Sequence, residues 1–137
     1  MNTYSPVIST QADLELAWRH LMGPFGYDHR SVWWMLIQPD DRPIPHLAEV
    51  EDASEVPDEV ERDNFASLLI HLQEGLEPGT RIAFLVSRPG HDGPRAKDLA
   101  WASALYDVAS RASVPCEVVH LASDAGVTPL PLDALAA

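Results

Sequence analysis

The sequence predicts an α/β domain (α+β, with a mixed sheet) in which helices cover both faces of the sheet, giving three layers. Apolar residues recur with the helical period over 10–22, 58–73 and 95–112, whereas continuous apolar runs rich in strand-forming residues fill 31–38 and 82–86. A strand that is apolar on both faces is covered on both. Helices and strands also alternate in the second half of the chain, which favours a mixed sheet between two helical layers.

The first half of the chain begins with a helix and a strand. Thr10 is a candidate N-cap, and Asp13 three residues later supplies the acidic half of a capping box. The strand that follows carries Trp33 and Trp34, which must point to opposite faces because strand side chains alternate. One tryptophan therefore lies against each helical layer, or in an interface.

A second strand is predicted over 44–50, after a turn at 39–42. Pro43 and Pro45 have no N–H to donate to a ladder, so this strand belongs at an edge of the sheet. We expect the two strands to pair as a hairpin.

The second half is predicted to form helix, strand, helix and two short strands. Asp58 is a candidate cap for the helix that runs to about residue 73. After the third helix we expect strands over 116–121 and 127–130, joined by a turn at 124–126. The predicted order is therefore α-β-β-α-β-α-β-β.

Length and composition indicate one domain, 1–137, with loosely ordered tails at 1–9 and 131–137. No run of about 20 apolar residues is present to span a membrane, and the N-terminus lacks the basic and apolar regions of a signal peptide. The single cysteine excludes an internal disulfide and a Cys-based metal cluster. We expect a cytoplasmic protein that does not enter a membrane.

The net charge of −12, from 21 acidic and 9 basic residues, repels phosphate backbones. Nucleic acid is therefore an unlikely partner. Part of the acidic surplus lies in 49–63, which is either a solvated rim or a docking surface for a basic protein.

The candidate ligand-binding pocket lies around the loop 87–94, where a buried strand leads to a helix N-terminus. Its residues are Arg88, His91, Asp92, Arg95 and Asp98. The two arginines could grip a small anionic ligand at the helix N-terminus, or pair with the two aspartates. Asp98 is also explained by its place in the first helical turn, where the helix dipole stabilises a carboxylate.

Catalytic chemistry has few candidates in this sequence. The one cluster that could rebuild a metal site is His91 and Asp92 with Asp98, to which His46 or His120 could be added. Cys116 has the features of a small buried hydrophobe, and no nucleophile elbow, phosphate loop or dinucleotide fingerprint is present. We therefore assign no catalytic residue, no metal ligand and no cofactor.

The layout of residues 10–130 resembles the JAB/JAMM metal-dependent hydrolase fold, most closely its bacterial RadC-like branch, within the JAB/cytidine-deaminase-like architecture. Four segments carry the resemblance. They are Arg30–Ile44 at the family's first hairpin, Val86–Pro89 where the family has His-x-His-Pro, Pro94–Asp98 where it has Pro-Ser-x-x-Asp, and Leu121–Asp124 at a late strand and turn.

The resemblance implies a metal site that has lost its ligands. In the family two histidines and an aspartate bind the zinc, and a glutamate handles the proton of the metal-bound water. Here Arg30 stands at the glutamate position, Val86 and Arg88 stand at the histidine positions, and Asp98 remains. The family serine position holds Arg95. The resemblance therefore implies a non-catalytic domain that binds a partner or acts as a scaffold.

Two alternatives stay open. One is a metal-dependent hydrolase with a relocated site formed by His91, Asp92 and Asp98. The other is a homo-oligomeric interaction protein, for example a homodimer formed through the Trp33/Trp34 strand or the proline-bearing edge. The expected partner is an unidentified protein or a small anionic ligand.

Overall fold

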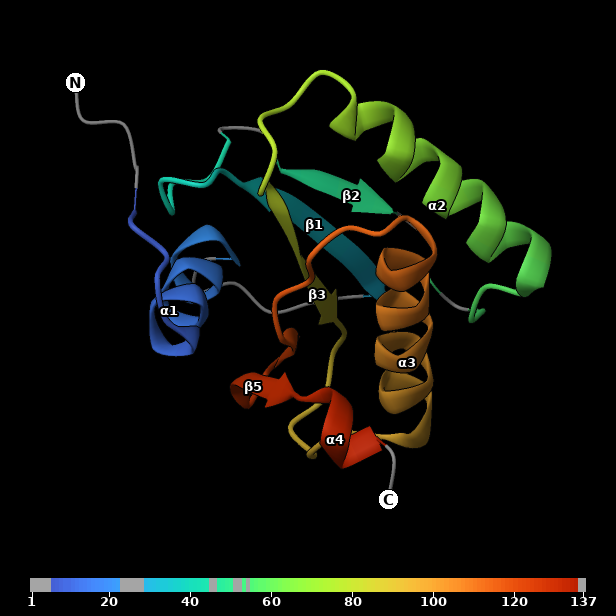
Figure 1. Cartoon of the computed structure of the whole chain (residues 1–137). Coiled ribbons are helices and arrows are strands. Elements are labelled where there is room, and N and C mark those ends of the chain that lie inside the picture. Colours follow the sequence, from blue (N-terminus) through green and yellow to red (C-terminus); the bar gives the residue numbers. More distant parts are fainter. Residues whose placement is uncertain (1–5, 23–28, 45–46, 51–52, 54, 136–137) are drawn as a thin grey trace.

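The computed structural model describes residues 6–22, 29–44, 47–50, 53 and 55–135, with side chains to 133. The chain folds in the predicted order, with one short helix added at its end (Figure 1). The elements are α1 (Gln11–Met22), β1 (Ser31–Ile37), β2 (Ala48–Val50), α2 (Glu59–Gln73), β3 (Arg81–Ser87), α3 (Ala96–Arg111), β4 (Val119–Ser123), β5 (Gly126–Leu130) and α4 (Leu132–Leu135).

The sheet has five strands in the order β2-β1-β3-β4-β5. β1 is antiparallel to both of its neighbours, β3 and β4 are parallel, and β4 and β5 are antiparallel, so the sheet is mixed as predicted. β1 pairs with β2 in a hairpin and β2 forms an edge, which confirms both expectations. Because β1 lies between β2 and β3, residues 32–34 of its backbone are paired on both sides.

Two strands begin later than the sequence predicts. The edge strand is Ala48–Val50 rather than 44–50, and Pro43 makes only an isolated bridge to Ile37. A proline cannot donate to a ladder, which explains the late start; Pro45 lies outside the described residues. β4 likewise begins at Val119, after an isolated bridge from Cys116 to Ile82.

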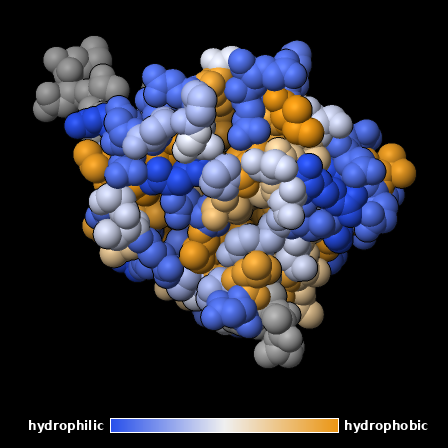
Figure 2. Space-filling view, viewed as in Figure 1, coloured by the Kyte–Doolittle hydropathy of each residue, from blue (hydrophilic) through white to orange (hydrophobic). Residues whose placement is uncertain are grey.

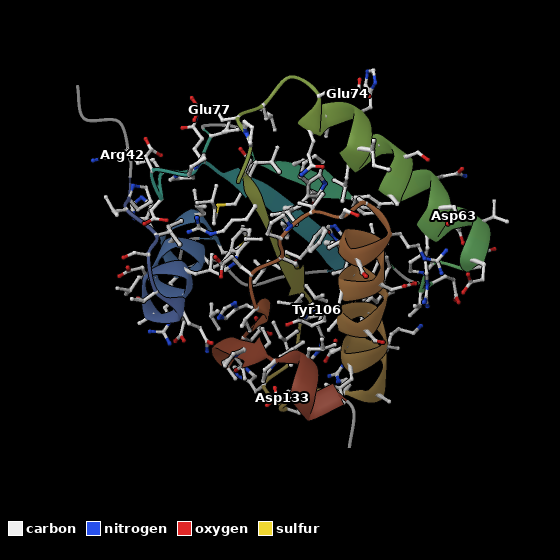
Figure 3. The ribbon with its side chains drawn as sticks, viewed as in Figure 1. Arg42, Asp63, Glu74, Glu77, Tyr106 and Asp133 are labelled. Atoms are coloured by element: carbon white, nitrogen blue, oxygen red, sulfur yellow. The ribbon has the colours of Figure 1, made fainter. Side chains whose placement is uncertain are left out.

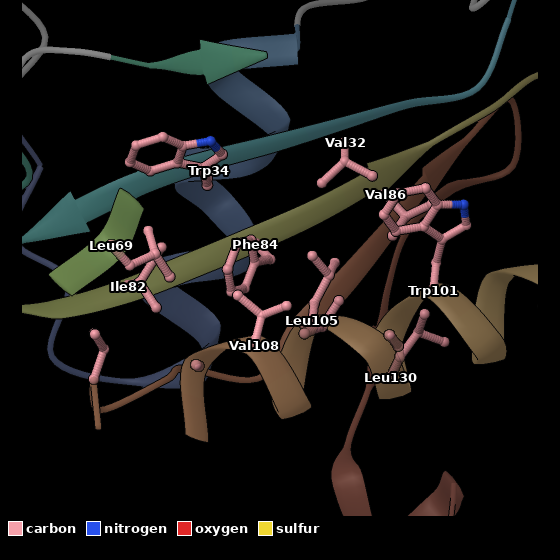
Figure 4. Packing of buried hydrophobic residues seen from close by; sticks show 14 of the residues in the cluster. Val32, Trp34, Leu69, Ile82, Phe84, Val86, Trp101, Leu105, Val108 and Leu130 are labelled. Atoms are coloured by element: carbon pink, nitrogen blue, oxygen red, sulfur yellow. The ribbon is translucent and has the colours of Figure 1, made fainter. Parts of the chain in front are cut away.

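One face of the sheet is covered by α2 and α3 and holds the larger apolar core (Figure 4). Trp34 of β1, Phe65 of α2 and Phe84 of β3 form an aromatic series across this layer. The ring centroids of Trp34 and Phe65 are 6.4 Å apart, and those of Phe65 and Phe84 are 6.0 Å apart in an edge-to-face arrangement. α3 adds a broad apolar face that includes Trp101 and Leu105.

The opposite face is covered by α1, whose buried residues are Leu14, Ala17 and Trp18. Figure 1 shows α1 on one side of the sheet and α2 and α3 on the other. The three-layer prediction is therefore confirmed. Trp33 packs against the α1 layer and Trp34 lies in the α2/α3 core, so the two side chains point to opposite faces, as predicted.

Parts of both tails depart from the loose order expected of them. The side chain of Ile8 packs in the α1 layer and is 1% exposed. Its backbone N–H also donates to the carbonyl of Asp41 at 2.6 Å. Residues 132–135 form α4. Residues 1–5 and 136–137 lie outside the described part of the chain.

Two helices begin with capping boxes; the sequence indicates the one at α1 and, at α2, the capping residue Asp58. At α1, the Asp13 carboxylate accepts from the backbone N–H of Thr10 at 3.2 Å, and the Thr10 hydroxyl accepts from the N–H of Asp13 at 3.1 Å. At α2, Asp58 accepts from Glu61 N at 2.8 Å and Glu61 accepts from Asp58 N at 3.1 Å. Hydrogen bonds from Ser9, the backbone one foremost, hold the pKa of Asp13 below its ordinary value.

The surface shown in Figure 2 is mainly hydrophilic, with hydrophobic residues in small patches. Within the described residues, none of the helices is long and apolar enough to cross a bilayer.

Replacing the α2 cap tests how much of the helix start depends on the side chain of Asp58. We expect Asp58→Ala to lower the free energy of unfolding by about 1 kcal/mol, because the N–H of Glu61 loses its acceptor. Asp58→Asn retains a capping oxygen and should remain close to the unchanged protein. Urea denaturation followed by circular dichroism measures both, and equal losses would contradict this account.

Candidate functional site

The candidate site lies at the carboxyl end of the central strand β3, where the loop 88–95 leads into α3. Arg88 follows the last residue of β3 and is 1% exposed, and Asp98 lies in the first turn of α3 and is fully buried. Three segments meet there, since Arg30 precedes β1 and reaches the same carboxylate.

Both carboxylate oxygens of Asp98 are occupied. Oδ1 accepts from Arg30 Nη1 at 2.6 Å, and Oδ2 accepts from Arg88 Nε at 2.9 Å and from the backbone N–H of Arg95 at 2.8 Å. Arg88 Nη2 also lies 2.9 Å from Oδ2. We call these three side chains, Arg30, Asp98 and Arg88, the buried ion network.

The buried ion network holds Asp98 in its charged form. Burial by itself raises the pKa of this carboxyl group, but the hydrogen bond from Arg88, the backbone N–H of Arg95 and the charges of Arg30 and Arg88 outweigh burial. The pKa of Asp98 therefore lies below its ordinary value. Asp98 is an ionised structural acceptor rather than a proton donor.

Arg88 also fixes the shape of the loop. Its Nη1 donates to the carbonyl of Pro89 at 3.1 Å, and its Nη2 donates to the carbonyls of Asp92 at 3.3 Å and Gly93 at 2.9 Å. One planar guanidinium thus binds a carboxylate and three loop carbonyls, a pattern that arginine supports with its five N–H donors. Each nitrogen of the guanidinium thus donates to an acceptor within the protein, which leaves none of them for a ligand.

Gly90 is required at the centre of this loop. Its φ is +109°, and a Cβ there would lie 2.7 Å from Arg95 Nη2 and 2.9 Å from Asp92 Oδ1. Its backbone N–H donates to Asp124 Oδ2 at 2.8 Å, and its carbonyl accepts from Asp124 N at 3.0 Å. The loop is therefore tied to the turn between β4 and β5.

Asp92 and Arg95 pair with each other on the surface. Arg95 Nε and Nη2 donate to the two oxygens of Asp92 at 2.6 and 2.7 Å. The hydrogen bond from Arg95 is the main reason that the pKa of Asp92 falls to about 2. Of the two interpretations drawn from the sequence, the pairing of arginines with aspartates is the one that the structure contains.

The histidines considered for a metal site do not gather around Asp98. His91 is exposed on the loop, and His120 of β4 is buried on the α1 face, opposite the face on which α3 packs. His46 lies outside the described residues. In the part of the chain that the structure describes, no three His, Cys, Asp or Glu side chains are grouped as a metal ion would need.

The acidic stretch 49–63 is partly used within the fold. Arg111 at the end of α3 lies 2.6 Å from Glu59, 2.7 Å from Asp63 and 2.9 Å from Asp107, and Arg62 lies 3.1 Å from Asp107. These ion pairs connect the start of α2 with the end of α3; Figure 3 labels Asp63 on α2. Two acidic residues of the stretch 49–63, Glu59 and Asp63, thus form ion pairs within the protein. Two others, Asp58 and Glu61, cap α2.

Sequence reasoning missed a groove of about 410 Å³ between α3 and α4. Tyr106 lines it, and its hydroxyl accepts from Val119 N and donates to Leu130 O, each at 2.9 Å, which ties α3 to a pair of facing residues of β4 and β5. Figure 3 shows Tyr106 on α3 and Asp133 on α4. Cys116 is half-buried in the lining, and burial raises its pKa to about 12, so the thiol stays protonated.

Removing the central carboxylate tests whether the buried ion network is structural. We expect Asp98→Ala to lower the free energy of unfolding by about 3–5 kcal/mol, because two guanidinium groups then lose their buried counter-charge. Asp92→Ala removes an exposed carboxylate of the same loop and should change stability little. Urea denaturation of both variants makes the comparison, and similar losses would contradict the distinction.

Comparison with known proteins adds no relative. No family model matches the chain, and searches of the curated proteins and of the solved structures found no significant match. The resemblance to the JAB/JAMM hydrolases therefore remains a hypothesis based on the residues themselves.

Proposed function

We propose that this domain is a non-catalytic binding or scaffold module with a RadC-like, JAB/JAMM frame whose metal site has degenerated. The observation that supports this most strongly is the occupation of both Asp98 oxygens by Arg30, Arg88 and a backbone N–H. The carboxylate that the resemblance leaves in place has become the centre of an ion network.

The chemistry of the site opposes a bound dication. A catalytic zinc takes about three protein ligands and keeps one open position. Two guanidinium groups lie 2.6 and 2.9 Å from the only candidate carboxylate, and their charges repel a metal ion. Together they supply next to Asp98 the two positive charges that a zinc ion would bring.

One contact supports the correspondence with the family frame. Arg30 and Asp98 are 68 residues apart in the sequence, yet the resemblance assigned both to one site, at the glutamate and aspartate positions. Arg30 lies 2.6 Å from Asp98, and Arg88, at a histidine position, binds the same carboxylate. Residues at three of the family's site positions therefore lie next to one another, as the proposed frame requires.

A relocated hydrolase site has less support. It would bring together His91, Asp92 and Asp98, but Asp92 is held by Arg95 and Asp98 is enclosed by the buried ion network. A metal would have to displace three guanidinium groups to reach both carboxylates.

The partner that best fits this site is a protein that recognises the outer surface of the loop. Residues 91–97 are exposed, while the buried Arg88 and the β4–β5 turn residue Asp124 hold the loop in place. A loop that is already ordered loses little conformational entropy on binding, which favours recognition. We also propose a cytoplasmic location, since the lone Cys116 has no disulfide partner.

Zinc titration distinguishes this proposal from the relocated hydrolase. We expect the purified protein, competed against a chromogenic chelator, to show no saturable one-to-one zinc binding, because the buried carboxylate of Asp98 is occupied by arginines. One-to-one binding that is lost in His91→Ala and in Asp92→Ala would overturn the proposal in favour of a hydrolase.

Restoring the family ligands tests the frame itself. We expect the triple variant Arg30→Glu, Val86→His, Arg88→His to gain zinc binding, because these side chains then meet at Asp98. The control Leu16→His, Val60→His adds two histidines at exposed positions on separate helices and should gain none. A folded triple variant that binds no more zinc than this control would remove the JAB/JAMM part of the proposal.

A further inference from the structure

His120 is a buried histidine with one unpaired ring nitrogen. It lies on β4 between Leu85 of β3 and Pro129 of β5, faces the α1 layer and is fully buried. Its Nδ1 is 3.0 Å from the carbonyl of Val118, and since a carbonyl only accepts, Nδ1 carries the hydrogen. Nε2 is then an acceptor, and among the described residues nothing donates to it.

A second unpaired group lies in the same layer. The indole Nε1 of Trp18, a fully buried residue of α1, also lacks a partner within the described part of the chain. The layer between α1 and the sheet thus leaves one donor and one acceptor unsatisfied, although buried polar groups are normally paired. Among the described residues, the α1 layer therefore has more buried polar groups without a hydrogen-bond partner than the α2/α3 layer.

Two acidic residues near His120 influence its protonation. Glu15 of α1 and Glu117, just before β4, each favour the protonated ring, whereas burial, the largest influence, opposes it and lowers the pKa. The strand partners on β3 and β5, Leu85 and Pro129, do not titrate. Glu15 is paired with Arg19 at 2.5 Å and Glu117 with Arg81, so neither carboxylate is held at the imidazole.

We propose that His120 is a pH-sensitive latch for α1, in which protonation of the buried imidazole detaches the helix from the sheet. A charged ring has no acceptor for its Nε2 proton in the closed layer, and opening gives it water and Glu15. α1 is the element that opens because it covers the face of the sheet toward which His120 points, where Leu14, Ala17 and Trp18 are its buried residues. The core between the sheet and α2 and α3 is separate and can persist.

The direction of the pH dependence follows from the two states. In the closed state the pKa of His120 lies below its ordinary value of 6.5, and in the open state it returns to that value. Above pH 6.5 opening does not depend on this group. Below pH 6.5 the open state binds more protons, so the opening equilibrium increases by about tenfold per pH unit until the closed-state pKa is reached.

The test is NMR of the isotopically labelled full chain between pH 8 and pH 4. We expect the ring signals of His120 to titrate below pH 6.5, and the amide signals of α1 to change with the same midpoint while those of α3 remain unchanged. Titration of His120 at or above 6.5, or titration without any change in α1, would overturn the proposal.

A substitution separates the latch from general acid denaturation. We expect His120→Gln to abolish the change in α1 near that midpoint, because glutamine does not titrate. His91→Gln removes an exposed histidine and should leave the change as it is. If His120→Gln does not fold, Glu15→Gln decides instead: it removes a carboxylate that favours the charged ring, so the midpoint should move to lower pH, and an unmoved midpoint would count against the latch.

Discussion

The carboxylate of Asp98 imposes the constraint on which the rest of this end of the sheet depends. It is fully buried and ionised, and a buried charge is tolerated only when it is paired and hydrogen-bonded. Its partners come from before β1, from the end of β3 and from the first turn of α3. The charge therefore fixes where three separate segments meet, which the apolar contacts of the core would not specify by themselves.

The loop shape follows from that constraint. Once Arg88 is placed on Asp98, its remaining N–H groups bind the carbonyls of Pro89, Asp92 and Gly93, and only glycine fits at position 90. A buried ion network of this kind is weak support for net stability, because well-packed apolar residues can do as well. Its effect here is to connect the loop carbonyls, through Arg88, to the carboxylate of Asp98.

The two layers of the fold differ in how completely their buried polar groups are hydrogen-bonded. The α2/α3 layer is closed by aromatic and aliphatic side chains, and the indole of Trp101 within it donates to the carbonyl of Ala53 at 3.0 Å. The α1 layer buries an indole N–H and an imidazole nitrogen without partners. The structure thus places a buried imidazole beneath α1, a helix with three buried residues, whereas α3 on the opposite face has seven.

The sequence by itself determined the order of the helices and strands, the three layers and the opposite directions of Trp33 and Trp34. These features depend on residues within a few positions of one another, through hydrophobic period, capping and the alternation of strand side chains. The same local patterns identified the loop around Arg88 and Asp98, but not the late starts of β2 and β4, where prolines and isolated bridges limit pairing. Only the tertiary structure decided that Asp124 holds Gly90 and that His120 lies beneath α1, because such partners are brought together by packing across the sheet and no local pattern records them.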